Sequence, residues 1–152
     1  MTYNFYKAAT LAALKRLQPA TGSTTMPILD NVLVEVREKE TIITATNMGV
    51  TITETLCFGG KPSAFLLPFS ETLNIFNTIK EDAIIEVDER IAIKSGKEIF
   101  KLGKSEDPAH FPTQKDEDYS FSTIVDWQFF YGLTTALKFS KQQQNEYVLL
   151  LS

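Results

Sequence analysis

The side chains that could perform chemistry in this chain are few and lie far apart in the sequence. The 152 residues include one histidine, His110, and one cysteine, Cys57. A single histidine beside Phe111 and Pro112 is typical of a surface residue rather than a general base, and Cys57 is interpreted as a small buried apolar residue. No phosphate-binding loop of the Gly-x-x-x-x-Gly-Lys type occurs. We therefore expect no enzymatic activity.

A metal centre and a cofactor site are not expected either. One cysteine excludes an internal disulfide and a cysteine-rich zinc site. Asp116, Glu117 and Asp118 could bind a hard cation, but a solvated run of charge in a linker is the simpler interpretation. The sequence thus predicts no metal ligand and no cofactor.

Composition narrows the class of protein further. A hydrophobic fraction of 43% and an aromatic fraction of 11% exclude a disordered chain. The apolar stretches are much shorter than the roughly 20 residues of a membrane-spanning helix, and no secretory signal is recognised, so a reducing, cytoplasmic setting is expected. The net charge of −4 argues against DNA binding through bulk positive charge. A nucleic-acid role would need a local cationic patch, or enclosure of the DNA.

The hydrophobic pattern predicts an α+β domain, with antiparallel sheets and two helices packed on one side. The first helix is expected over residues 7–17, where Leu11, Leu14 and Leu17 share a stripe and Pro19 ends the helix. The second is expected from about 70 to 80, with Ser70 as its N-cap. Strands are expected over residues 3–6, 31–37, 41–46, 50–56, 64–67, 83–87, 91–95 and 98–102.

A strand–helix–strand opening occurs three times, which indicates an internal repeat. Tyr3-Asn4-Phe5 begins the first copy and Tyr119-Ser120-Phe121 begins the third. The third copy is expected to have strands over 119–125 and 146–151 around one helix. The predicted organisation is a domain over residues 1–103, a polar linker over 104–118, and an incomplete strand–helix–strand repeat over 119–152.

Several motifs, in order along the chain, resemble the bacterial replicative sliding clamp, the beta subunit of DNA polymerase III. MPILDNVLVEV at 26–36 is similar to the entry into this family's second strand, and TIITATNMGVTIT at 41–53 is similar to its paired strands. LLPFSETLNIFNTI at 66–79 is similar to its second helix, and IAIKSGKEIFKL at 91–102 to its last hairpin. His110-Phe111-Pro112 is similar to the Phe-Pro that closes its first domain, and LKFSKQQQNEYVLLL at 137–151 to the start of its second domain.

The resemblance implies a DNA-clamp-like fold, corresponding to domain one of a clamp and the start of domain two. It also implies self-association into a ring of six such domains, with helices lining the hole and duplex DNA threaded through. By the same resemblance, the partners would be DNA, a DNA polymerase and a clamp loader, and the chain would be a non-catalytic processivity factor.

The resemblance also suggests which residues contact DNA, because the ends of the helices and two polar loops would face the hole. Cations at helix C-termini also interact favourably with the helix dipole, which explains such residues without any DNA. A polar surface loop likewise accounts for the glutamines. The candidate DNA-binding residues are Lys15, Arg16, Ser23, Thr24, Lys80, Lys138, Lys141, Gln143 and Gln144.

Two departures from the family weaken the predicted grip on DNA. The loop at 21–25 has no arginine where the family often carries one, and the second helix has Glu71 and Asn77 where basic residues would help. The alternative hypothesis is therefore a clamp-like protein-interaction module with no DNA-binding role.

Overall fold

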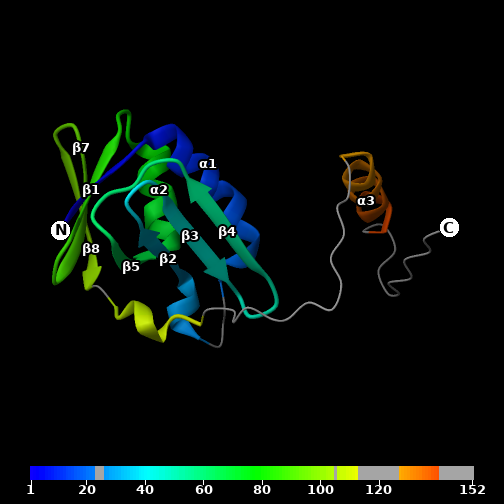
Figure 1. The fold of residues 1–152 in the computed structure, drawn as a ribbon, viewed down its shortest axis with the longest axis horizontal. Helices are drawn as coiled ribbons and strands as arrows, with labels where there is room; N and C mark the ends of the chain where they lie inside the picture. The colour runs from blue at the N-terminus through cyan, green and yellow to red at the C-terminus, as the bar shows by residue number, and fades with distance from the viewer. Residues whose placement is uncertain (23–25, 105, 113–126, 141–152) are drawn as a thin grey trace. The chain divides into compact units, whose positions relative to one another are not determined.

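The computed structural model describes residues 1–22, 26–104, 106–112 and 127–140, without the side chains of Phe130 and residues 136–140. The chain divides into two compact units, Met1–Gln114 and Lys115–Ser152. In its described residues, the first unit combines two antiparallel sheets with a pair of helices (Figure 1). The expected α+β architecture is thus confirmed.

Both sheets of the first unit have four strands. One has the order β1-β6-β7-β8 and the other the order β4-β3-β2-β5. The first sheet consists of β1 (Thr2–Phe5), β6 (Ala83–Val87), β7 (Arg90–Ser95) and β8 (Glu98–Lys104). The second consists of β2 (Asn31–Val36), β3 (Thr41–Thr46), β4 (Thr51–Leu56) and β5 (Ser63–Pro68).

The two helices connect strands and pack against each other. Helix α1 (Lys7–Leu17) buries Leu14 and Leu17 of its predicted stripe together with Ala13, and Leu11 is partly buried against the same core. The helix also contacts β3 and β4. Helix α2 (Phe69–Thr78) buries Phe69, Ile75 and Phe76 among its residues. Their positions beside the sheets can be followed in Figure 1.

The predicted N-cap of the second helix is wrong. Helix α2 starts at Phe69, so Ser70 lies inside it, and Pro68 occupies the cap position without a side-chain hydrogen bond. Pro68 still pairs with Asn31 as the last residue of β5. Its φ of −59° suits both the end of a strand and the entry to a helix, so the chain passes from one to the other without a separate cap.

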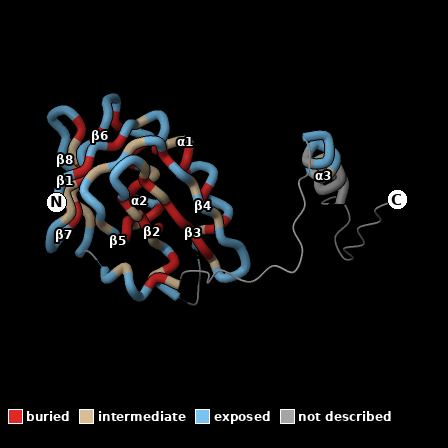
Figure 2. The backbone as a smooth tube through the Cα atoms, viewed as in Figure 1, coloured by how far each residue is buried: buried red, intermediate tan, exposed pale blue. Residues whose placement is uncertain are grey.

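One hydrophobic core joins both sheets and both helices. The alternation of β2 places Val32, Val34 and Val36 in this core, and the register brings Val34 opposite Phe65 of β5. Figure 2 shows buried positions along the strands and helices, whereas the turns are mostly exposed. The helices are therefore held against the sheets by one continuous apolar core. The apolar faces that they contribute to it are largely those that the helical spacing predicts.

A second, smaller cluster lies on the other face of β2 and β5. It consists of Leu29, Leu33, Leu66 and Phe111, with Leu33 directly opposite Leu66 in the register. Phe111 is only 3% exposed, although the sequence predicts a polar linker over residues 104–118. The start of that segment instead belongs to the first unit, since β8 extends to Lys104 and Phe111 packs on the sheet.

The second unit contributes one described helix, α3 (Trp127–Ser140), where the sequence predicts its third helix. Trp127 and Tyr131 of α3 are exposed. The strands predicted over 119–125 and 146–151 lie outside the described residues. Among the helices that the structure describes, none is long and apolar enough to cross a membrane.

Candidate nucleic-acid interface

The helix pair is organised by a contact between the start of α1 and the segment after α2. The backbone N–H of Lys7, the first residue of α1, donates to Oδ1 of Asp82 over 2.8 Å. Asp82 is only two residues beyond Lys80, so Lys80 lies near the N-terminal end of α1. Lys15 and Arg16 are eight and nine residues further along α1, roughly 12–14 Å along the helix axis. The candidate cations of the first unit are therefore divided between the two ends of α1.

Lys15 and Arg16 are exposed in the last turn of α1. Their position follows from the helical period, because Ala13, Leu14 and Leu17 turn into the core and leave residues 15 and 16 outside. The structure thus exposes both side chains that the sequence singled out at this end.

Arg16 is not a free cation. Its Nε and Nη2 donate to Oε1 and Oε2 of Glu54 on β4, both over 2.7 Å, in a two-pronged ion pair. The Glu54 hydrogen bond raises the pKa of Arg16, and the Arg16 guanidinium lowers the pKa of the Glu54 carboxyl. The two groups form a pair with no net charge on the exposed side of the helix.

Sequence reasoning missed Glu54, although a signal for it exists. Ile52, Glu54 and Leu56 alternate along β4, so they share the face of the strand that is turned toward the core and α1. A carboxylate on that half-buried face is stabilised by a cationic partner, because partial burial of an unpaired charge is unfavourable. The alternation indicates the need for a partner, but only the packing of α1 on β4 identifies that partner as Arg16.

At the other end of the pair, Lys80 lines a hollow of about 240 Å³. The hollow lies between the end of α2 and the β7–β8 turn, and it also receives Lys97 from that turn. Gly96 has φ +56° there, and a Cβ would stand 3.1 Å from Oε2 of Glu81, so a side chain would be strained and crowded. Sequence reasoning did not select Lys97. It adds a second cation near Lys80, with Glu81 and Glu98 in the same lining.

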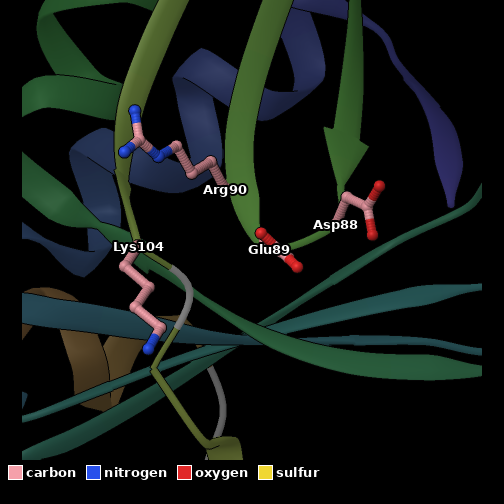
Figure 3. A pocket seen from close by; sticks show the side chains of 4 residues that line it. All are labelled: Asp88, Glu89, Arg90 and Lys104. Carbon is pink, nitrogen blue, oxygen red and sulfur yellow. The ribbon is translucent and has the colours of Figure 1, made fainter.

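A larger open hollow, of about 520 Å³, lies at the far end of the β6–β7–β8 sheet. It is lined by Asp88, Glu89, Arg90 and Lys104 (Figure 3). The side chains of Arg90 and Lys104 point away from each other in this view, and the two carboxylates lie to one side. The four groups therefore do not converge on a common ligand position, and their charges cancel.

The other predicted DNA contacts belong to segments or side chains outside those that the structure describes. Ser23, Thr24, Lys141, Gln143 and Gln144 lie outside the described residues. Lys138 belongs to α3, but its side chain is not among those described. On α2, Glu71 and Asn77 are exposed, so this helix presents a carboxylate rather than a basic row.

The residues considered for catalysis are not brought together. His110 is exposed in a short 3-10 turn, Pro108–His110. Cys57 is exposed, contrary to the expected burial, because it follows the buried Leu56 just beyond the end of β4. In the described parts of the chain, no three histidine, cysteine or acidic side chains gather where they could hold a metal ion. Asp116, Glu117 and Asp118 lie outside those parts.

Comparison with known proteins points to one class of protein. The chain is 28% identical over 124 residues to the beta sliding clamp of Haemophilus influenzae, and 29% identical over 124 residues to that of Vibrio cholerae. Each match covers 76% of this chain and 31% of the relative. No protein-family profile matches the chain.

Solved structures agree with these relatives. The DNA polymerase III beta subunit of Pseudomonas aeruginosa superposes with a TM-score of 0.73 at 22% identity, over 80% of this chain and 34% of that one. The beta chain of Streptococcus pneumoniae TIGR4 gives a TM-score of 0.78 at 18% identity, over 87% of this chain and 38% of that one.

The fold is therefore that of a DNA-clamp domain. In sequence and in structure, the chain resembles part of the beta subunit of bacterial DNA polymerase III, the beta sliding clamp, and it spans about a third of the length of the relatives it matches. The predicted resemblance is confirmed.

Proposed function

We propose that this chain acts as part of a sliding clamp that encircles duplex DNA and confers processivity on a replicative polymerase. The observation that carries the proposal is the clamp fold itself, matched over about four fifths of the chain. Its helix pair offers cations at both ends of α1. The role is non-catalytic and would be performed in the cytoplasm.

A clamp of this kind works by topology rather than by tight grip. A closed ring cannot dissociate sideways from DNA, so its phosphate contacts can be weak and still retain the polymerase. Weak, sequence-independent contacts also suit sliding, because they do not fix the protein at one register. The net charge of −4 is compatible with such a mechanism, since enclosure replaces bulk attraction.

A chain that spans a third of its relatives would close a ring only by self-association or as part of a longer assembly. Self-association and contacts with a polymerase and a clamp loader are accordingly included in the proposal. Within the described residues, Lys15 and Lys80 are proposed as direct phosphate contacts, and Arg16 as a contact limited by Glu54. Ser23, Thr24, Lys138, Lys141, Gln143 and Gln144 remain predicted contacts.

Retention on circular DNA tests the proposal. The full chain, incubated with nicked circular duplex and with the same duplex linearised, should remain on the circle during gel filtration and should leave the linear form through its ends. The charge-reversed variant Lys15→Glu with Lys80→Glu should lose retention on the circle. A matched control, Lys39→Glu with Lys61→Glu, makes the same charge change at exposed positions in the β2–β3 and β4–β5 loops and should leave retention unchanged.

The alternative is a clamp-like module that binds proteins and has no DNA role. The neutralised Arg16 and the exposed Glu71 favour it, because both reduce the positive charge of the helix pair. Equal elution from circular and linear DNA, with no effect of the Lys15 and Lys80 reversals, would support this alternative over encirclement.

A further inference from the structure

We infer that Glu54 is a positioning residue that limits the attraction of the helix pair for DNA phosphates, because it holds the Arg16 guanidinium in a neutral pair. The inference rests on the proposed function and concerns the same surface. It predicts that the end of α1 behaves toward a phosphate as one cation, Lys15, instead of two.

The geometry leaves Arg16 little freedom. Both Glu54 oxygens are engaged, each at 2.7 Å, and the planar fork of the guanidinium matches the carboxylate in a single orientation. The Glu54 side chain is only 18% exposed, whereas that of Arg16 is 57% exposed. The carboxylate is therefore the fixed member, set in the sheet, and it determines where the exposed arginine lies.

The other ion pairs in the described residues differ from this one. Lys94 with Glu86 and Arg37 with Glu40 each make one contact, of 2.7 and 2.8 Å, and all four side chains are about 40–60% exposed. Such pairs exchange readily with water and salt. The Arg16–Glu54 pair is more constrained, since it has two hydrogen bonds and one largely covered partner. A phosphate would have to compete with a carboxylate already in place.

A purely structural explanation exists for Glu54. A charge that points inward on the edge strand β4 discourages further strands from pairing there, and the ion pair also fastens α1 to that strand. This role alone predicts that loss of the carboxylate lowers stability without strengthening DNA binding. The two roles therefore predict opposite signs for the effect on affinity.

Fluorescence anisotropy with a short linear duplex, at several salt concentrations, separates these explanations. Glu54→Gln keeps the side-chain shape but removes the charge, so Arg16 gains a free positive charge. We expect it to bind the duplex about three- to tenfold more tightly at low salt, and the slope of log affinity against log salt to steepen by about 0.9, as for one additional phosphate. Arg16→Gln should bind more weakly than the wild-type chain, because it leaves Glu54 unpaired.

Two further variants control for net charge and for pairing. Glu86→Gln makes the same change of charge on the β1-β6-β7-β8 sheet and should alter affinity less than twofold. The double variant Arg16→Gln with Glu54→Gln removes a neutral pair and should bind within about twofold of the wild-type chain. Equal gains for Glu54→Gln and Glu86→Gln would overturn the inference, as would a double variant as weak as Arg16→Gln alone.

The outcome for Glu54 is separable from the outcome for encirclement, because a short linear duplex needs no closed ring. If the chain leaves circular and linear DNA alike but Glu54→Gln still tightens binding to the short duplex, encirclement is wrong and the inference stands. If the chain stays on circles and Glu54→Gln changes nothing, the inference alone is wrong. If no variant binds the short duplex at low salt, the inference is also wrong.

Discussion

At the scale of single residues, two threonine hydroxyls on the helix pair are buried without a hydrogen bond in the described structure. Thr10 on α1 and Thr72 on α2 are 2% and 0% exposed, and neither hydroxyl has a hydrogen-bond partner among the described residues. Thr78, by contrast, donates its hydroxyl to the carbonyl oxygen of Asn74. A buried hydroxyl without a partner keeps the cost of its lost hydration.

Thr72→Val is therefore expected to stabilise the protein. The replacement keeps the β-branched shape and removes the unpaired hydroxyl, so the free energy of unfolding should rise by about 1 kcal/mol. Urea denaturation followed by circular dichroism measures the change. Thr78→Val is the matched control, and it should be neutral or slightly destabilising because that hydroxyl is exposed and bonded. A fall in stability for Thr72→Val would contradict the argument.

At the scale of elements, α1 takes its N-terminal cap from outside its own segment. Tyr6 stands at the cap position with no side-chain hydrogen bond, and the acceptor is the Asp82 carboxylate from the loop before β6. A carboxylate at this point also suits the positive end of the helix dipole. The same contact fixes the start of α1 next to Lys80, so the cap is part of what arranges the candidate cations.

Asp82→Ala should lower the free energy of unfolding by about 1 kcal/mol, the usual cost of a lost cap. Asp82→Asn should lower the free energy of unfolding less, because the amide oxygen can still accept a hydrogen bond from the backbone N–H of Lys7. Thermal denaturation of both variants tests whether Asp82→Ala is the less stable of the two. The control is Asp88→Ala in the β6–β7 turn, which should change stability by less than about 0.5 kcal/mol. A loss for Asp88→Ala as large as for Asp82→Ala would show that charge, not capping, is responsible.

The β3–β4 turn shows how one element supports another. Oδ1 of Asn47 accepts from the backbone N–H groups of Gly49 and Val50, and Met48 has φ +72°. A methionine in the left-handed region costs about 1 kcal/mol or more, which the turn's hydrogen bonds offset. Nδ2 of Asn47 donates to the carbonyl of Pro19, so the turn is tied to the segment that ends α1.

At the scale of the whole molecule, the β4-β3-β2-β5 sheet of the first unit has buried apolar side chains on both of its faces. The main core lies against the helices, and the small cluster around Leu33 and Leu66 is completed by Phe111. Phe111 arrives after β8, more than 40 residues beyond β5, and closes the unit. The boundary of the unit is thus set by this packing rather than by the polar composition of residues 104–118.

Phe111→Ala should destabilise the first unit by about 3 kcal/mol, as expected when a buried phenylalanine is removed from a packed cluster. Amide hydrogen exchange should also show weaker protection at Leu33 and Leu66, because their face of the sheet would be uncovered. His110→Ala, one residue earlier and exposed, is the matched control and should leave both measurements unchanged. Unaltered protection in Phe111→Ala would mean that the segment does not hold this face.

Local periodicity predicted most of the secondary structure, because the side chains within one element carry the signal. Helix α1 and strands β3 and β6 have the expected bounds, and the other described strands of the first unit differ by one or two residues. Helix α2 begins earlier than the sequence pattern predicts, since Pro68 allows the strand to continue directly into the helix. The clamp resemblance could also be recognised from ordered local motifs.

Contacts between distant parts of the chain could not be read from the sequence. Glu54 meets Arg16 across 38 residues, Asp82 caps α1 across 75, and Phe111 reaches a sheet formed far earlier in the chain. Each of these contacts depends on strand order, on register and on the direction in which a helix crosses a sheet. None of these properties produces a periodic pattern within one segment of the sequence. The types and exposure of the candidate cations are therefore local properties, whereas their effective charge is a consequence of folding.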